Sequence, residues 1–373
     1  INIHNWTNTV QEQFSNPYWT LNRQKPISDR NRYEFGGTVK YDIMEGLSAT
    51  GRIRYERGDE HWTQNDYASS TAGRDKLGTM KDDHIFSEQT YADALLQYNK
   101  TWEDTYSLSV TAGGSYTKTK GSNVSLIGYG DTQFAINNGV ITSGAYYPNK
   151  FIPSNYYRLS TGMSLKEKRL NSVFATAQFG YKEGLYVDVS ARNDWSSALA
   201  FTEGVSFFYP SVGASALLNK FIDFGKNVDL FKFRASYSIV GNDVPIYASN
   251  VLYTIGDQGS LVPPSEAPFR TLKPEKTNSL EVGFDGTFFQ NRFDVNVTYY
   301  KTNTKNQFFK VSAPYESGVK TRYVNAGNIE NQGFEVSLGW RQQFTDNFSW
   351  STNYNFSYNN NKVIELVDGL ADG

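Results

Sequence analysis

Several residue types that define common functional classes are scarce in this sequence. None of the 373 residues is cysteine, which excludes disulfides and thiolate-bound zinc or iron–sulfur sites. Histidine occurs three times, at His4, His61 and His84, so a His-rich metal centre is not expected. Neither sign of charge is in excess, because 36 Lys and Arg residues stand against 38 Asp and Glu, a formal net charge of -2. This balance argues against a nucleic-acid-binding surface.

The sequence also lacks any apolar run near the roughly 18 residues that a membrane-spanning helix needs. Aromatic residues nevertheless make up 16% of the chain, with 26 Tyr and 25 Phe, although the mean hydropathy is -0.55. Apolar groups must therefore be dispersed among polar ones. Two classes of protein have that pattern, soluble β-sheet proteins and membrane β-barrels.

Strict alternation of apolar and polar residues recurs along the chain. Phe293, Val295 and Val297 alternate with polar residues, and the same holds for Phe334 and Val336. A period of two indicates strands with two different faces. We count about twelve such segments, near 32–42, 47–57, 89–99, 105–118, 171–181, 185–194, 208–217, 231–241, 278–289, 292–302, 333–341 and 348–359. Most are longer than the roughly 5–6 residues of ordinary strands and match the about 9–11 of a membrane barrel.

Short and long connections alternate between these segments. Short ones include Ile43-Met44-Glu45-Gly46 and Gln290-Asn291. Long ones are predicted as extracellular loops near 58–88, 119–170, 195–207, 242–277 and 303–332. Outer-membrane barrels show this asymmetry. The sequence therefore predicts an all-β fold, an antiparallel membrane barrel. Because the sequence begins at Ile1 without an initiator Met and ends in the loop-like segment 368–373, we expect residues 1–373 to form one barrel portion of a longer chain.

Several motifs resemble the SusC/RagA-like branch of TonB-dependent outer-membrane transporters. They occur in the family's order through most of the chain. The motif residues are Asn16–Trp19, Ala191–Ser197, Phe208–Gly213, Phe231–Tyr237, Leu272–Gly283 and Asn325–Glu335. The segment Ala191-Arg192-Asn193-Asp194-Trp195-Ser196-Ser197 departs from the family pattern, since Asn-Asp-Trp stands where Arg-Asp-Gly is more usual.

This resemblance implies a 22-stranded barrel of which about 12 strands lie here, with the plug domain outside this chain. It implies TonB-dependent import of oligosaccharides or oligopeptides across the outer membrane of a Gram-negative bacterium. Its implied partners are a SusD-like surface lipoprotein, TonB acting through an N-terminal region not in this chain, and outer-membrane lipid. No bond is changed in such transport, so neither catalytic residues nor a cofactor are expected.

The sequence contains no phosphate-binding loop, paired-histidine zinc motif or nucleophile elbow. His61 and His84 lie near acidic residues in the predicted 58–88 loop, and we interpret both as solvated loop residues. Acidic loop residues could hold Ca²⁺, but the EF-hand spacing is missing.

Aromatic side chains in the predicted loops are the candidates for substrate contact, because function commonly lies on loops. They are Trp62, Tyr146, Tyr147, Tyr156, Tyr157, Trp195 and Tyr253. Packing of the loops against one another is the competing explanation for each ring. Two alternatives to a transporter stay open at this point. One is an outer-membrane barrel enzyme such as a surface protease or lipase, and the other is a soluble β-sandwich that binds glycans or mediates adhesion.

Overall fold

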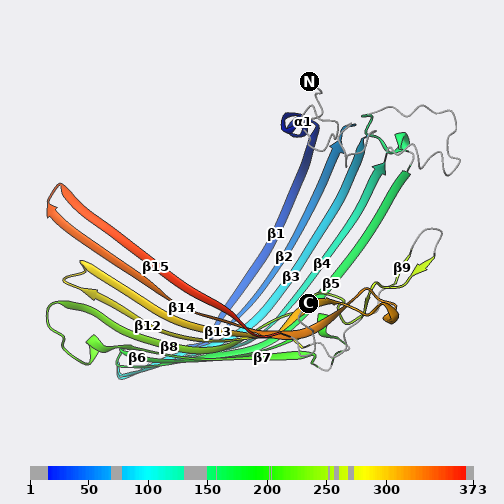
Figure 1. Cartoon of the computed structure of the whole chain (residues 1–373). Helices are drawn as coiled ribbons and strands as arrows, with labels where there is room; N and C mark the ends of the chain where they lie inside the picture. The colour runs from blue at the N-terminus through cyan, green and yellow to red at the C-terminus, as the bar shows by residue number, and fades with distance from the viewer. Residues whose placement is uncertain are drawn as a thin grey trace, which may run out of the picture. The chain divides into compact units, whose positions relative to one another are not determined.

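The computed structural model describes residues 16–68, 78–129, 149–156, 158–200, 202, 204–250, 253–255, 260–267 and 273–366 (Figure 1). The chain divides into two compact units, which we describe separately. Unit 1 comprises residues 1–37, 54–90 and 118–167, and unit 2 comprises residues 38–53, 91–117 and 168–373. Strands dominate both units.

One short helix, α1 (Pro17–Arg23), precedes the first strand. The Asn16 side chain accepts a hydrogen bond from the backbone N–H of Tyr18 at 3.0 Å, and Pro17 occupies the first turn. An Asn cap followed by proline favours a helix start, since proline has no N–H to leave unsatisfied there. The Asn16–Trp19 motif, which resembles a family loop, therefore begins a helix.

Twelve long strands form the described fold, which confirms the number predicted from alternation. They are β1 (Gln24–Met44), β2 (Leu47–Asp66), β3 (Thr79–Trp102), β4 (Tyr106–Tyr129), β5 (Arg158–Tyr181), β6 (Leu185–Ser196), β7 (Ser206–Leu217), β8 (Val228–Asn242), β12 (Glu275–Phe288), β13 (Phe293–Ser312), β14 (Thr321–Thr345) and β15 (Phe348–Glu365). Short strands β9 (Thr254–Ile255), β10 (Leu261–Val262) and β11 (Glu266–Ala267) and 3-10 turns η1 (Pro153–Asn155), η2 (Ser197–Leu199), η3 (Leu218–Lys220) and η5 (Tyr315–Ser317) lie in the connections.

The long strands pair in chain order, β1-β2-β3-β4-β5-β6-β7-β8-β12-β13-β14, and β15 adds to β14. The registers described for β5 to β8 and β12 to β15 are antiparallel. The short strand β11 pairs in parallel with the start of β14, and β9 pairs with β10 in a separate two-stranded sheet. The antiparallel fold predicted from the sequence is confirmed.

The predicted loops 58–88, 119–170 and 303–332 are too long, because the flanking strands continue into them. Strand β2 extends to Asp66 and β3 begins at Thr79, while β13 extends to Ser312. His61, His84 and Trp62 therefore lie in strands. These extensions carry polar residues on both faces, so they lack the alternation from which the strands were predicted.

Tight turns join the strands at the end opposite the predicted long loops. Glu103 and Asp104 both have positive φ, at 48° and 54°, as do Lys182 and Glu183, at 49° each. Two consecutive left-handed residues give a type I′ turn, whose twist matches that of the flanking strands; each turn is closed by a backbone hydrogen bond, from Thr105 to Trp102 and from Gly184 to Tyr181. In the turn between β1 and β2, Gly46 has φ 78°, and a Cβ there would lie 2.2 Å from the carbonyl oxygen of Asn99.

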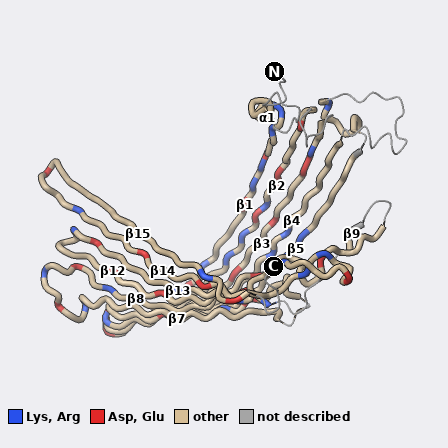
Figure 2. Tube along the Cα trace, in the orientation of Figure 1, with Lys and Arg blue, Asp and Glu red and all other residues tan. Residues whose placement is uncertain are grey.

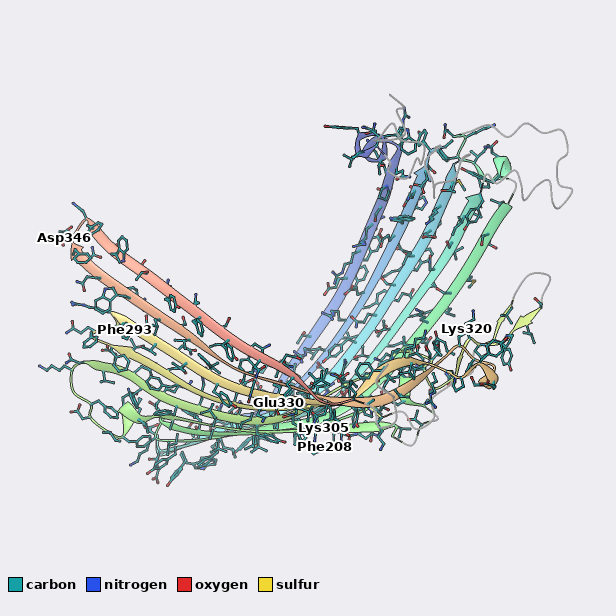
Figure 3. All side chains as sticks on the ribbon, in the orientation of Figure 1. Phe208, Phe293, Lys305, Lys320, Glu330 and Asp346 are labelled. Atoms are coloured by element: carbon teal, nitrogen blue, oxygen red, sulfur yellow. The ribbon has the colours of Figure 1, made fainter. Side chains whose placement is uncertain are left out.

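The strands of unit 2 carry one apolar and one polar face. A row of apolar residues runs through paired positions of eight strands, Tyr181, Leu185, Ala216, Phe233, Phe284, Val297, Val336 and Phe356. The next row on the opposite face is polar, Lys232, Asp285, Asn296, Ser337 and Asn355. Figure 3 marks Phe293 and Asp346 toward the tight-turn end of β13 to β15, and Lys320 near the opposite end.

The apolar face is exposed in this chain. Phe233, Phe334 and Phe356 keep 45%, 41% and 43% of their surface accessible. A β-sandwich would bury such rows between two layers, so the sandwich alternative is wrong for the described strands. No helix among the described residues is both long and apolar enough to cross a membrane.

Charged side chains on the polar face are paired across strands. In unit 2, Arg52 makes a bidentate contact with Asp93, whose side chain is fully buried, and Tyr91 donates to the same carboxylate at 2.6 Å. In unit 1, Arg30 and Ser28 both bond Glu60. Both signs of charge are interspersed along the strands (Figure 2). A buried carboxylate needs such partners, because an unpaired charge is costly to desolvate.

Candidate functional site: the folded connections of unit 2

A cluster of buried apolar residues lies in the connections after β6 and β8 and at the start of β7. Its members, here called the loop core, are Ala198, Leu199, Phe207, Val244 and Ala248, with Leu170, Tyr209 and Phe308 packed against them. Leu199 has no accessible surface. Residues on both sides of the β6–β7 connection and after β8 therefore form one packed unit.

The loop core packs on the polar face of the sheet. Phe207 and Tyr209 belong to it, whereas Phe208 between them is 54% exposed and shares its face with Val212. Successive strand residues point to opposite faces. The connections after β6 and β8 thus fold back over the polar face.

Hydrogen bonds from the end of β6 hold these connections in place. The Ser196 hydroxyl donates to an Asp243 carboxylate oxygen at 2.5 Å, and Lys168 Nζ lies 2.6 Å from the same oxygen. Ser196 Oγ also accepts from the backbone N–H of Ala198 at the start of η2, and Ser197 Oγ accepts from the N–H of Arg169. The side chains of Ser196 and Ser197, at the end of the Ala191–Ser197 motif, therefore link the end of β6 to the segment after β8 and to β5.

Arg192 and Asp194, the charged residues of the same motif, also make hydrogen bonds on the polar face. Arg192 Nε donates to Asp194 at 2.7 Å, and its Nη2 donates to the Ser172 hydroxyl at 2.8 Å. The Arg192 guanidinium lies 5.5 Å from the Phe174 ring centre. Asp194 is buried, so the Arg192 contact compensates its desolvation.

A pocket of about 370 Å³ opens beside the loop core. Its lining residues come from two connecting segments and β14, namely Pro245, Ile246, Tyr247, Ala248, Asn250, Val262, Pro263, Pro264, Ser265, Glu266, Ala267 and Tyr323. The volume is within the range of small-molecule sites. Most of the lining is apolar or aromatic, with one carboxylate, so the pocket can take an apolar side chain or the face of a sugar ring.

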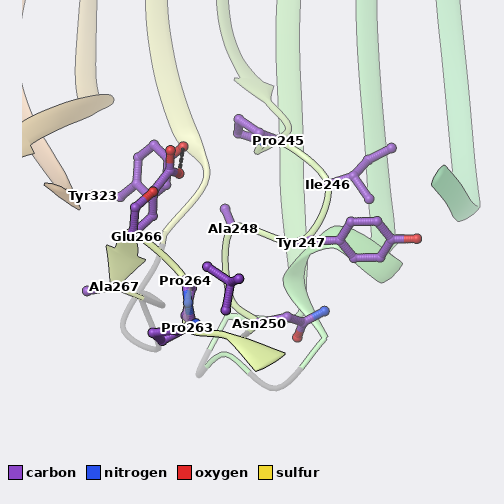
Figure 4. Close-up of a pocket in the computed structure, with 12 residues that line it drawn as sticks. Pro245, Ile246, Tyr247, Ala248, Asn250, Pro263, Pro264, Glu266, Ala267 and Tyr323 are labelled. Atoms are coloured by element: carbon purple, nitrogen blue, oxygen red, sulfur yellow. Dashed lines mark hydrogen bonds between the residues drawn. The ribbon is translucent and has the colours of Figure 1, made fainter. Parts of the chain in front are cut away.

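Glu266 and Tyr323 lie at one side of the pocket, joined by a hydrogen bond (Figure 4). The Tyr323 hydroxyl donates to Glu266 at 2.7 Å, and Lys310 Nζ bonds the other carboxylate oxygen. The Tyr323 ring also stacks on Phe308, with ring centres 4.4 Å apart, and Phe308 packs on the loop core. These contacts join the pocket wall to strands β13 and β14.

The contacts among Glu266, Lys310 and Tyr323 shift the pKa of each of these residues. The hydrogen bond from Lys310 is the main cause that lowers the pKa of Glu266, and the bond from Tyr323 adds to it. The same carboxylate raises the pKa of Lys310 and of Tyr323. All three residues lie in the connections or in the strand extensions next to them.

We expect acid to release the β11 segment. In the docked state, β11 is paired with β14. Because the folded-state pKa of Glu266 is lowered, the ionised carboxylate stabilises this state at pH values above its unfolded pKa of about 4.3. This stabilisation is lost as the pH falls through the folded-state pKa. Hydrogen exchange of the Lys320 and Thr321 amides, which both donate to the Ser265 carbonyl, should therefore accelerate below about pH 4.

In the variant Glu266→Gln, the Lys320 and Thr321 amides should exchange faster already at neutral pH. Their exchange should show no further acceleration, the acid step, below about pH 4. Glu316→Gln is the matched control, since Glu316 is an exposed acid of η5. An acid step that persists in Glu266→Gln would contradict the assignment.

The seven aromatic residues predicted to contact substrate are not brought together. Tyr146, Tyr147 and Tyr157 lie outside the described residues. Tyr156 is buried, and its ring covers Gly128, where a Cβ would lie 2.6 Å from the ring. Trp62 is half-buried in β2.

The two remaining candidates lie in unit 2. Trp195 was predicted in a loop, which is wrong, because it pairs with Asn171 and Ser206 inside the sheet. It shares its face with the exposed Val187 and Val189, on the apolar side. Tyr253 is 59% exposed immediately before β9. Neither residue lines the pocket, and substrate contact by any of the seven stays a prediction.

The pocket residues were missed in the sequence because their signal is weak. Pro263 and Pro264 mark a rigid connecting segment, but proline alone does not predict a binding wall. Tyr323 and Glu266 are 57 residues apart, and only the fold shows that they are bonded.

Comparison with known proteins identifies the fold. Residues 2–372 match the family profile described as "TonB dependent receptor-like, beta-barrel". The chain belongs to this family. The match covers nearly the whole sequence and agrees with the exposed apolar face and the strand order given above. Barrels of the family lie in the outer membrane of Gram-negative bacteria.

Two curated relatives are TonB-dependent receptors. TonB-dependent receptor P3 of Formosa agariphila is 26% identical over 371 residues, covering 97% of this chain and 36% of the relative. TonB-dependent receptor SusC of Bacteroides thetaiotaomicron is 28% identical over 137 residues, covering 35% of this chain and 14% of the relative. The chain thus spans about a third of the length of receptor P3. The resemblance to the SusC/RagA-like branch is confirmed.

Solved structures agree on the fold. The RagAB peptide importer in its closed-closed state matches with a TM-score of 0.80 at 20% identity, covering 99% of this chain and 40% of the solved chain. The ferric-catecholate import receptor Fiu of E. coli matches with a TM-score of 0.52 at 12% identity, covering 88% of this chain and 48% of the solved chain. At these identities the likeness shows a shared barrel architecture.

Proposed function

We propose that this chain is the wall of an outer-membrane importer that takes up oligosaccharides or oligopeptides, driven by TonB. The observation that carries the proposal is the folded connection layer of unit 2, with its pocket beside a polar strand face. Substrate would bind against this layer, and TonB would open the path inward by acting on the plug. A SusD-like surface lipoprotein would deliver the substrate to the extracellular connections.

The relatives support transport over the other functions considered. SusC and receptor P3 are named as TonB-dependent receptors, and the RagAB structure is that of a peptide importer. These relatives are named for reception and import and not for a reaction that changes a bond. We therefore propose that the chain has no catalytic role.

Uptake by cells tests this proposal. A strain lacking the full-length gene should fail to accumulate either a fluorescent oligopeptide or a fluorescent oligosaccharide that the parent strain takes up, and the gene should restore uptake. Deleting tonB should have the same effect. The Tyr323→Ala variant, which removes one wall of the pocket, should lower uptake more than Tyr315→Ala, since Tyr315 is 96% exposed and outside the pocket lining. Uptake that survives deletion of the gene and of tonB would overturn the proposal.

A further inference from the structure

His61, Asp82 and His84 form a compact group in unit 1. His61 lies in β2, and Asp82 and His84 lie two residues apart in the neighbouring β3. Residues two apart in a strand share a face. The imidazole Nε2 atoms of His61 and His84 lie 3.0 Å and 3.3 Å from the same Asp82 oxygen, Oδ1.

The spacing of these atoms suits a metal ion. The ligand atoms of the three residues all lie within 4.8 Å of one another. Zinc binds imidazole nitrogen and carboxylate oxygen at about 2.0–2.2 Å, which in a tetrahedral site separates neighbouring ligand atoms by about 3.4 Å. The two observed nitrogen–oxygen distances are close to that value.

Both imidazole rings have their Nε2 atom beside the Asp82 carboxylate. The rings stack with centres 4.3 Å apart and an interplanar angle of 14°. Two imidazoles and one carboxylate are a ligand set that zinc and the neighbouring divalent transition metals accept. Hard cations such as Ca²⁺ prefer six or more oxygen ligands and fit this set poorly.

The group is open to solvent. The side chains of His61, Asp82 and His84 are 44%, 34% and 52% exposed. A metal ion can therefore reach them without any rearrangement of the strands. Three protein ligands also leave the fourth tetrahedral position for water or for an exogenous donor.

We propose that His61 Nε2, His84 Nε2 and an Asp82 carboxylate oxygen bind one divalent transition-metal ion of the Zn²⁺ class, which cross-links β2 to β3. The fourth coordination position faces solvent. This site revises the interpretation of both histidines as independent solvated loop residues. Sequence reasoning missed it because His61 and Asp82 are 21 residues apart and meet through cross-strand pairing.

Metal titration of the full chain in detergent tests the site. After removal of metal with EDTA, ZnCl₂ is added in competition with a chromogenic chelator. The wild-type protein should bind one Zn²⁺ at this site. Loss of a direct ligand should cost at least the roughly tenfold in affinity that loss of an outer-shell partner costs, so His61→Gln, His84→Gln and Asp82→Asn should each weaken binding by that factor or more.

Two matched controls should bind Zn²⁺ with wild-type affinity. Asp83→Asn changes the adjacent acid, which alternation puts on the other strand face. His4→Gln removes the remaining histidine of the sequence. Equal affinity in the wild type, His61→Gln and His84→Gln would overturn the proposal, as would the same loss in Asp83→Asn as in Asp82→Asn.

Co²⁺ absorption of the wild-type protein gives a test that depends on no variant. A bound Co²⁺ should show the intense visible d–d bands of four-coordination, and added Zn²⁺ should abolish them. The weak spectrum of hexaaquo Co²⁺ in the presence of the protein would overturn the site. Import is not measured, so this outcome is independent of the proposed transport function.

Discussion

Replacing Val336 by arginine is expected to lower the free energy of unfolding in a lipid bilayer by about 2–4 kcal/mol, the cost of a cation on the lipid face near the midplane. Val336 belongs to the apolar row, where it pairs with Val297 and Phe356. Its side chain points to the same side as those two residues. An arginine there would lie among acyl chains with no acidic partner from the paired positions.

Ser337→Arg is the matched control for Val336→Arg. Ser337 is the next residue of β14, and it pairs with Asn296 and Asn355 on the polar face. A cation on that face stays hydrated, so the unfolding free energy should change little, within about 0.5 kcal/mol. Urea unfolding of the full chain in vesicles, followed by tryptophan fluorescence, measures both variants. Equal destabilisation by the two substitutions would contradict the assignment of the faces.

The sequence predicted the strands and their faces because period-two alternation is a local property. Val297 and Asn296 point to opposite sides whatever their partners are, so the apolar row could be predicted before any pairing was known. Strand ends were predicted poorly. Residues 58–66 of β2 are mostly polar, and the alternation that marks 47–57 stops there, although the strand continues to Asp66.

The site could not be predicted to the same extent, because its contacts join distant residues. Ser196 bonds Asp243, 47 positions away, and Lys310 bonds Glu266, 44 positions away. The family resemblance singled out Ala191–Ser197 as a motif without indicating what its serines bond. The choice of loop aromatics passed over Tyr323, although it lies in the predicted loop 303–332. The structure places Tyr323 near the start of β14, where it bonds Glu266.

The loop core stabilises the connections, whereas different contacts stabilise the strands. Its buried residues belong to η2, the start of β7 and the segment after β8. The strands themselves are held by paired backbone groups along their whole length. We therefore expect that the connections can be loosened while the sheet stays folded, as local opening free energies vary across a protein.

Leu199→Ala is expected to destabilise the folded connections by about 2–5 kcal/mol, the usual cost of truncating a buried leucine. Leu199 is fully buried within the loop core, and its replacement by alanine would leave a cavity. Hydrogen exchange should accelerate at residues 197–200 and 243–250 and stay unchanged in β12 to β14. Uptake of substrate should fall, because Ala248 and Pro245 of the loosened segment line the pocket.

Leu261→Ala is the control for this prediction, since Leu261 lies in the same set of connections but is 70% exposed. Exposed truncations of this kind change stability by less than about 0.5 kcal/mol. If Leu199→Ala left exchange at residues 243–250 unchanged, the segments after β6 and β8 would open independently and the loop core would not be one unit. If exchange rose while uptake stayed at the wild-type level, the folded connections would exist for stability, and the substrate path would have to lie elsewhere along the polar face.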